Sequence, residues 1–286
     1  GEDRNKKRKF GILYFERPTN LFFRDVKRLV DQRLAQCGGG NPPEYVYDDF
    51  GSVGNPAERP QHATALQGFR NEGVTTILFI SPQNGEFSRS AQSIDWHPEW
   101  VLFGESSNDD FVSARYTEPA VWQHAWVVTN VTLVGRQDEQ PCALALREVD
   151  PSFPSVDLPY TCEYYNQLRQ LFTGVQVAGP RLSPESLEAG FRAIPAVAST
   201  SPQVPSCYYL PNDFTCVKDG NAMWWDPDAV IRGWSGEGCW RVPEAGKRFI
   251  SDEWPNLNYP ERQNRGGDVC NGYTSNSTFN PHQQTG

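Results

Sequence analysis

Apolar runs and stretches of helical spacing alternate along the first hundred residues. The apolar runs predict strands at 9–15, 44–48, 75–80 and 100–103. The intervening segments repeat apolar positions every three to four residues and predict helices at 21–37, 60–72 and 85–94. Strands that alternate with helices of this length indicate an α/β fold with a mostly parallel, twisted sheet and helices on both faces. Such sheets bind ligands at the carboxyl ends of their strands.

The alternation weakens after residue 103. We expect a short helix at 110–116, a strand at 123–133 and a long Pro- and charge-rich connection at 136–157. A helix at 159–175 carries Tyr164, Leu168 and Leu171 on one stripe. Another helix, at 182–194, begins with Ser183 as N-cap and a proline at its first position.

The chain changes character at residue 195, where Pro, Gly, Trp and Tyr begin to dominate. This part should form short strands and ordered loops, because it is rich in aromatic residues. The predicted organisation is a basic tail, an α/β lobe, a connecting and helical segment, an irregular aromatic and Cys-rich region, and a flexible tail, at 1–8, 9–135, 136–195, 196–270 and 271–286.

Charge and hydropathy restrict the partners. The net charge of −9 argues against nucleic acid, which requires a basic surface. The basic run at 4–9 is expected to be a solvated tail. The chain contains neither an apolar stretch of bilayer length nor an amino-terminal signal sequence. Export would therefore depend on a signal that these 286 residues do not include.

Seven cysteines are present, and none forms a C-x-x-C pair, which argues against a zinc site. Six of them follow residue 140, a pattern that favours disulfides and an oxidising compartment. Cys207–Cys216 would close a short loop and is the pair best supported by spacing. The remaining suggested pairs, chosen among many pairings, are Cys142–Cys162 and Cys239–Cys270. Cys37 is either a buried thiol at a helix end or the partner of a cysteine outside this chain.

Several segments resemble a known family. KFGILYF, FRNEGVTTILFISPQ and HPEWVLFGE resemble the second lobe of type 1 periplasmic binding proteins, the solute-binding proteins of ABC transporters for branched-chain amino acids and related solutes. LFTGVQVAGPRLSPESLEAGF, DFTCVKDGNAMWWDPD and GCWRVPEAGKRF resemble divergent extracellular members from actinobacteria. The resemblance covers about residues 9–254.

The resemblance implies that a first lobe is missing from this chain. In the family, helices such as those at 159–175 and 182–194 pack onto that lobe. The chain would then be a carboxy-terminal fragment, a processed half or a one-lobed descendant. The implied partners are a small polar solute, the missing lobe or a partner chain, and membrane transporter components.

The resemblance also implies where solute would bind, because loops after the strands line the cleft between lobes. The candidate ligand-binding residues are Tyr14, Glu16, Ser81, Gln83, Asn84, Glu105, Ser106 and Asp109. Their hydroxyl, amide and carboxylate groups suit an ammonium or a polyol. Each could instead be a cap or turn residue, and Arg17 is equally compatible with ordinary surface.

No motif indicates an enzyme, and we predict no catalytic residue, cofactor or metal. The carboxylates between Asp213 and Asp228 could bind calcium, but turns and caps are the favoured interpretation. Trp96 and Trp100 are predicted to be core residues.

We therefore expect an extracellular solute-binding protein, or the carboxy-terminal half of one, that captures an amino acid, an amide or a similar molecule for an ABC transporter. The alternative is a cell-surface assembly subunit or a sensor ectodomain with the same fold.

Overall fold

The structure is a computed structural model of the chain. It describes residues 5–19, 21–48, 56–81, 85–103, 117–130, 141–152, 158–200, 204–230, 237–241, 247–250, 269–270 and 273–274.

The chain forms two compact units, and each is described by itself. Unit 1 consists of Gly1–Val131, Ala222–Val230 and Ser235–Pro243. Unit 2 consists of Thr132–Asn221, Ile231–Trp234 and Glu244–Gly286.

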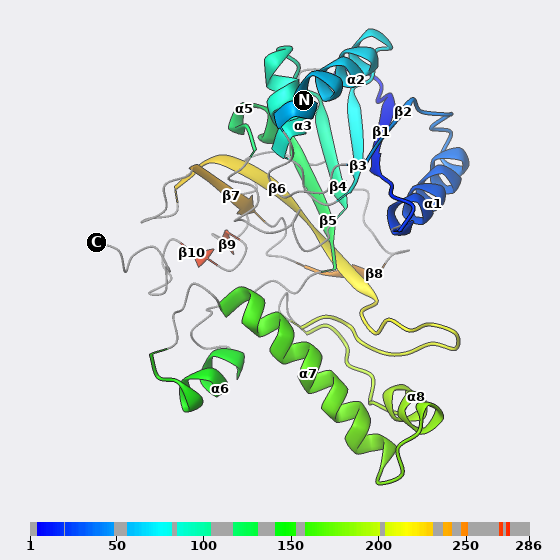
Figure 1. Ribbon diagram of the computed structural model, residues 1–286, viewed down its shortest axis with the longest axis vertical. Coiled ribbons are helices and arrows are strands. Elements are labelled where there is room, and N and C mark those ends of the chain that lie inside the picture. The colour runs from blue at the N-terminus through cyan, green and yellow to red at the C-terminus, as the bar shows by residue number, and fades with distance from the viewer. Residues whose placement is uncertain are drawn as a thin grey trace. The chain divides into compact units, whose positions relative to one another are not determined.

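Unit 1 contains the regular α/β part of the chain (Figure 1). Its strands are β1 (Phe10–Phe15), β2 (Glu44–Tyr47), β3 (Thr76–Ile80), β4 (Glu99–Phe103), β5 (Ala125–Thr129), the greater part of β6 (Asp219–Val230) and β7 (Glu237–Arg241). Its helices are α1 (Phe22–Gln36), the 3-10 turn η1 (Pro56–Glu58), α2 (Arg59–Asn71), α3 (Gly85–Ser93) and α5 (Pro119–Trp122). The predicted strands and helices of the first hundred residues are thereby confirmed.

The strand order is β2-β1-β3-β4-β5-β6-β7. β1 to β5 pair in parallel, and β6 and β7 pair antiparallel. Every residue of β3 is buried, as expected for a central parallel strand covered on both faces. The order 2-1-3-4-5 with right-handed crossovers places α1 on one face and α2 and α3 on the other. The predicted α/β fold with a mostly parallel sheet is confirmed.

A row of packed aromatic side chains lies between the sheet and the helices α2, α3 and α5. Phe87 on α3 packs against Phe79, with ring centres 5.7 Å apart. Phe79 contacts Trp100 at 6.1 Å, and Trp100 contacts Trp122 at 5.7 Å. Trp100 and Trp96 are fully buried, so their predicted place in the core is confirmed.

In its described residues, unit 2 contains helices and short strands. Its elements are α6 (Pro141–Val149), α7 (Leu158–Ala178), α8 (Pro184–Arg192), the start of β6, β8 (Phe249–Ile250), β9 (Val269–Cys270) and β10 (Tyr273–Thr274). The helices expected at 159–175 and 182–194 are confirmed as α7 and α8. Ser183 caps α8 as predicted, accepting a hydrogen bond from the backbone N–H of Ser186, whose hydroxyl accepts one in return.

Glycines allow α7 and α8 to approach closely. A Cβ added to Gly190 would collide with the carbonyl oxygen of Gly174 and lie 2.8 Å from the backbone nitrogen of Ala178. The ring of Phe191 lies over Gly174 in the same contact. The spacing of the two helices is therefore set by the absence of side chains at these glycines.

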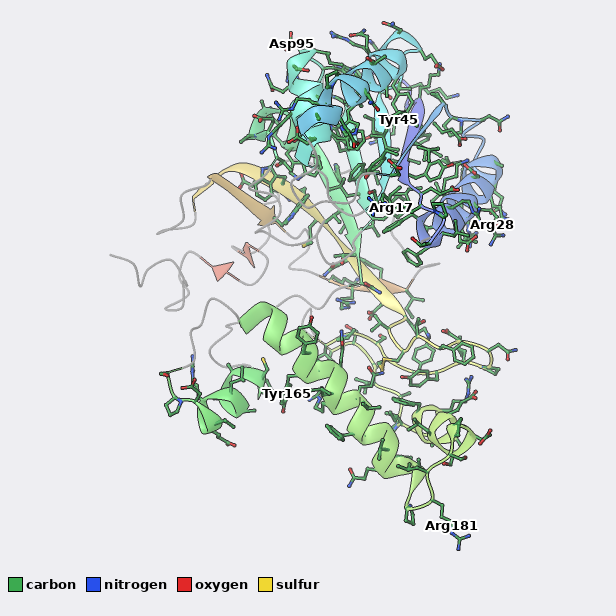
Figure 2. The ribbon with its side chains drawn as sticks, viewed as in Figure 1. Arg17, Arg28, Tyr45, Asp95, Tyr165 and Arg181 are labelled. Carbon is green, nitrogen blue, oxygen red and sulfur yellow. A yellow bond between two sulfur atoms is a disulfide. The ribbon has the colours of Figure 1, made fainter. Side chains whose placement is uncertain are left out.

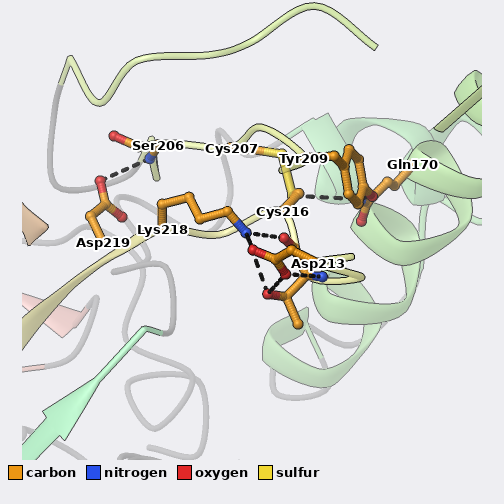
Figure 3. Close-up of a disulfide and its surroundings, with 9 residues drawn as sticks. Gln170, Ser206, Cys207, Tyr209, Asp213, Cys216, Lys218 and Asp219 are labelled. Atoms are coloured by element: carbon orange, nitrogen blue, oxygen red, sulfur yellow. Dashed lines mark hydrogen bonds and ion pairs between the residues drawn. A yellow bond between two sulfur atoms is a disulfide. The ribbon is translucent and has the colours of Figure 1, made fainter. Parts of the chain in front are cut away.

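The predicted disulfide between Cys207 and Cys216 is present and closes a loop that packs on the two helices (Figure 3). The side-chain amide of Gln170 on α7 donates to the hydroxyl of Tyr209 at 2.7 Å. Arg192 on α8 donates to the carbonyl of Leu210 at 2.8 Å. The disulfide thus shapes a loop whose contacts bring it onto the helical layer.

The other cysteine predictions have mixed outcomes. Cys142 is disulfide-bonded, but the side chain of Cys162 lies outside the described residues. The side chains of Cys239 and Cys270 lie outside them as well. Cys37 is a free, exposed thiol, so the expectation of a buried thiol is wrong. It follows the last turn of α1, where a change of chain direction carries it away from the core.

Two further expectations need correction. The connection expected at 136–157 contains helix α6, because Cys142 and Ala143 form a small apolar cluster with Leu146 that the charged flanking sequence conceals. β6 is a long strand rather than a short one. The described residues 5–9 of the basic run are exposed, as expected for a solvated tail, and the guanidinium of Arg8 also forms an ion pair with Glu99 of β4 at 2.7 Å. The expected helix at 110–116 lies outside the described residues.

Candidate functional site

The sheet of unit 1 has a topological switch point between β1 and β3. The chain goes from β1 through α1 to β2, then from β2 through α2 to β3 on the other side of β1. Connections that diverge to opposite faces leave a crevice at the carboxyl ends of the two strands, and ligands bind there in such sheets. Tyr14 pairs with Ile80, so these ends are adjacent. We define the switch-point edge as the described residues directly after the strands: Glu16, Arg17, Asp48 and Ser81.

Two buried hydroxyl groups lie at this edge. The hydroxyls of Tyr47 and Ser81 share a hydrogen bond, and both residues are buried. The ring of Tyr47 packs against Phe15 at 5.9 Å and against Phe87 at 4.7 Å, which fixes the phenol across the end of β1. Ser81 was predicted from the sequence, whereas Tyr47 was missed. The sequence feature that could have identified Tyr47 is a tyrosine at the last position of a predicted strand.

The rim of the edge carries both signs of charge. Arg17 donates a hydrogen bond from Nε to the carbonyl of Asp48 at 2.5 Å, and its guanidinium lies 5.4 Å from the centre of the Phe15 ring (Figure 2). Arg24, on the first turn of α1, has Nη1 3.8 Å from the carboxylate of Glu16. The backbone N–H of Glu16 donates to the carbonyl of Tyr47 at 2.9 Å. One carboxylate and two guanidiniums therefore surround the end of β1.

Tyr14 does not share this edge with Ser81. Successive side chains of a strand point to opposite faces, and Phe15 is the neighbour that packs against Tyr47. Tyr14 instead lies beneath α1, where Nζ of Lys27 is 5.6 Å from the centre of its ring. Burial, followed by the nearby carboxylates of Glu44 and Glu16, raises the pKa of its phenol. Its position is that of a packing residue under the helix.

The remaining candidates lie outside the described residues: Gln83, Asn84, Glu105, Ser106 and Asp109. Their roles stay predictions.

The helix that follows β3 is anchored by a buried ion network. Glu86 in the first turn of α3 accepts hydrogen bonds from Arg59 and Arg89, both at 2.6 Å. Burial acts to raise the pKa of Glu86, but these two hydrogen bonds outweigh it and the pKa lies below its usual value. The network fixes the start of α3 behind the switch-point edge.

The carboxylates suggested for calcium have structural partners where they are described. Asp213 accepts hydrogen bonds from Lys218 at 2.6 Å and from the backbone of Thr215 at 2.9 Å (Figure 3). Asp219 pairs with Arg248 at 2.8 Å. Within the described ranges, no cluster of three or more metal-ligating side chains exists. No helix among the residues that the structure describes is long and apolar enough to span a membrane.

Comparison with known proteins identifies a fold. No protein-family model and no curated protein sequence matches the chain. A fatty acid ABC transporter substrate-binding protein from Thermomonospora curvata matches with 15% identity and a TM-score of 0.54 over 86% of this chain and 58% of its own. The leucine-, isoleucine-, valine-, threonine- and alanine-binding protein of Brucella ovis matches with 12% identity and a TM-score of 0.55 over 88% of this chain and 60% of its own.

An amino acid ABC transporter substrate-binding protein from Pseudomonas fluorescens gives a similar result, with 11% identity and a TM-score of 0.52 over 89% of this chain and 62% of its own. The chain therefore spans about three fifths of the length of these neighbours. The expected resemblance to ABC transporter substrate-binding proteins is confirmed at the level of the fold. The assignment of lobes and an actinobacterial origin stay predictions.

Proposed function

We propose that the protein binds a small polar solute at the switch-point edge and works as an extracellular substrate-binding component of an ABC transporter. The observation that carries this proposal is the grouping of Glu16, Arg17 and Arg24 above the buried hydroxyls of Tyr47 and Ser81, at the ligand-binding position of a doubly wound sheet. The fold shared with substrate-binding proteins supports it.

The charges at the rim favour a solute with both a carboxylate and an ammonium or amide group. A guanidinium presents paired N–H donors that match a carboxylate, and Glu16 offers an acceptor for an N–H group. The hydroxyls of Tyr47 and Ser81 can donate to and accept from the same molecule. An amino acid or its amide meets all three requirements.

The experiment is a thermal-shift and calorimetric screen of amino acids, amides, polyols and fatty acids against wild type and R17A. One charge-assisted hydrogen bond contributes ~1.5–3 kcal/mol, so R17A should weaken binding by about 10-fold or more. R28A is the matched control, because Arg28 is an exposed residue of α1 away from the switch-point edge (Figure 2). Equal affinities of R17A and wild type would contradict the proposed site.

We further propose that another lobe completes the protein by covering the helices of unit 2. Tyr164, Leu168 and Phe172 form an apolar stripe on α7 with exposed fractions of 65%, 51% and 65%. In the described part of unit 2, the buried apolar side chains are those of Cys142 and Ala143. A helix stabilises a globular unit mainly by burying such a stripe, so α7 requires a covering surface.

L168E tests this partner. The substitution should leave the unfolding midpoint of the isolated chain nearly unchanged, because Leu168 is half exposed. It should weaken association with the covering polypeptide in material from the native source, as measured by native mass spectrometry without reduction. Q167E, at an exposed position of the same helix, is the control. Retention of the partner by L168E would exclude the stripe as the contact.

The same stripe favours a second candidate function, that of a cell-surface assembly subunit. In that case the covering surface would be another copy of this chain. Light scattering after size exclusion distinguishes the two. A concentration-dependent oligomer of the chain alone, abolished by L168E and unaffected by solutes, supports assembly, whereas a complex with a different polypeptide supports solute binding.

A further inference from the structure

Asn221 is a buried side chain whose hydrogen-bonding groups are unused. It lies at the start of β6 in unit 2 with an exposed fraction of 1%. Neither Oδ1 nor Nδ2 has a hydrogen-bond partner among the described residues. Buried side-chain amides in native proteins are nearly always paired with protein groups or an ordered molecule, because leaving them unpaired is costly. The amide of Asn221 therefore calls for a partner.

Asp219 is the nearest polar side chain on the same strand, and its carboxylate oxygens already have hydrogen-bond partners. Asp219 lies on the same face of β6, since it is two residues away on a strand. Its Oδ2 accepts from the backbone N–H of Ser206 at 2.8 Å (Figure 3). Its Oδ1 accepts from Nε of Arg248 at 2.8 Å. Both side chains of this ion pair are buried. Asn221 thus lies beside a polar cluster rather than in a purely apolar core.

Strand register brings Arg248 near Asn221 as well. β6 and β8 pair with Asp219 opposite Ile250 and Gly220 opposite Phe249. Continuing this register by one residue places Asn221 opposite Arg248. The guanidinium nevertheless turns toward Asp219, donating to its carboxylate and, from Nη2, to its carbonyl oxygen at 3.1 Å. The register therefore places Asn221 beside the Asp219–Arg248 ion pair.

We infer that Asn221 binds a small neutral molecule that both donates and accepts hydrogen bonds. The amide offers two N–H donors and one carbonyl acceptor, so the ligand must supply an acceptor and a donor close together. Because the nearby charges of Asp219 and Arg248 are already paired with each other, a charged ligand would enter the buried site without a counter-ion of its own, which is strongly unfavourable. The fitting class comprises water and the hydroxyl or carboxamide group of an uncharged solute.

The test compares the thermal unfolding of wild type and N221L, a substitution of similar shape that removes both polar atoms. If Asn221 holds a ligand that also bonds to the surrounding groups, N221L lowers the unfolding midpoint by about 2–8 °C. If the amide has no partner, replacing it by an apolar side chain leaves the midpoint unchanged or raises it, and the inference is overturned. N166L, at an exposed position of α7, is the matched control.

Acetamide distinguishes the two sources of the ligand, with sodium acetate as its charged counterpart. A larger acetamide-induced rise of the midpoint in wild type than in N221L, with no such difference for acetate, identifies a neutral solute. A destabilised N221L without any acetamide difference identifies an ordered water. A selective response to acetate would overturn the requirement for a neutral ligand.

A second measurement applies to wild type and covers the case in which N221L does not fold. Magnetisation transfer to the Nδ2 hydrogens of Asn221 is recorded by NMR from water and from added acetamide. Transfer from either supports the site, and the absence of transfer from both overturns it. The result is independent of Arg17 and the switch-point edge, so this inference and the proposed function can fail separately.

Discussion

At the residue scale, two nearby carboxylates are used in opposite ways. Asp213 is a partly exposed acceptor for Lys218 and for the backbone of Thr215. Asp219 is buried and forms an ion pair with the buried guanidinium of Arg248. The contribution of Asp213 to stability should depend on pH, because its hydrogen bonds favour the ionised carboxylate. For Asp219, stability should depend on the presence of Arg248, because a single buried charge is far more costly than a buried ion pair.

D213N should flatten the acid limb of the stability profile. Hydrogen bonds from Lys218 and Thr215 lower the pKa of Asp213 from 3.8 to about 2. Since the folded pKa is the lower one, the carboxylate stabilises the fold above about pH 4 and loses this contribution as the pH falls from 4 toward 2. The measurement is the unfolding midpoint of wild type and D213N between pH 2 and 7. An unchanged gap between them across that range would refute the expected linkage.

R248M should be strongly destabilising. The substitution leaves the Asp219 carboxylate buried without its cation, which costs ~3–5 kcal/mol in comparable cases. Urea unfolding of the variant gives the free energy directly. R181M, at an exposed position shown in Figure 2, should change it by less than about 0.5 kcal/mol. Similar losses in both variants would mean that the buried pair has no special role.

The residues of the site were only partly predictable from the sequence. Glu16 and Ser81 follow apolar runs that end recognisably, so the position rule for parallel sheets finds them. Tyr47 contributes through the direction of its ring across β1, which depends on strand order and not on local pattern. Tyr14 illustrates the converse, because a phenol near a strand end can lie beneath a helix instead of at the edge.

At the element scale, strands buried on both faces gave the strongest sequence signal. β1 and β3 are continuous apolar runs, and their predicted bounds differ from the observed ones by one residue at most. α6 was missed because a helix of only nine residues, flanked by charged and Pro-containing sequence, resembles a connection. β6 was underestimated because Asp226, Pro227 and Asp228 interrupt its apolar pattern, although the strand continues through them.

Two glycine substitutions should have opposite effects on helices. G190A should destabilise the protein by ~1–3 kcal/mol, because the added methyl group collides with the backbone of α7. G68A should stabilise it by up to ~1 kcal/mol, since no atom lies within 4 Å of the new Cβ and alanine favours the helix. Chemical denaturation of both variants provides the comparison. A stabilising G190A would mean that the close helix contact does not exist.

The cap of α8 provides a smaller effect. S183A removes the hydroxyl that accepts from the backbone N–H of Ser186 and should cost ~1 kcal/mol. S183T keeps the acceptor and should recover most of that loss. Hydrogen exchange of the first-turn amides of α8 is the local readout. Equal protection in S183A and wild type would show that the cap contributes little.

At the scale of the whole molecule, the two units differ in how they bury apolar surface. The described part of unit 1 contains most of the buried aromatic side chains, whereas the described part of unit 2 exposes a continuous stripe on α7. Periodicity predicted a stripe of Tyr164, Leu168 and Leu171, whereas the most exposed large apolar side chains of α7 are Tyr164, Leu168 and Phe172. Periodicity also cannot specify what covers the stripe.

Removing the disulfide tests how unit 2 is held together. Closing the short loop between Cys207 and Cys216 stabilises the folded chain by about 2–3 kcal/mol on the chain-entropy account. The double substitution C207S/C216S should lower the midpoint of unit 2 and reduce amide protection around Gln170, which contacts the loop. Amide protection across β1 to β5 should stay unchanged and serves as the internal control. Uniform loss of protection in both units would show that they unfold together.

A side chain at Gly190 would collide with the backbone of Gly174, so this contact limits how close α7 and α8 can lie. A relative with a side chain at the position of Gly190 must space the two helices more widely, because the clash there is with backbone. A relative with a side chain at the position of Gly174 must place the ring of Phe191 elsewhere.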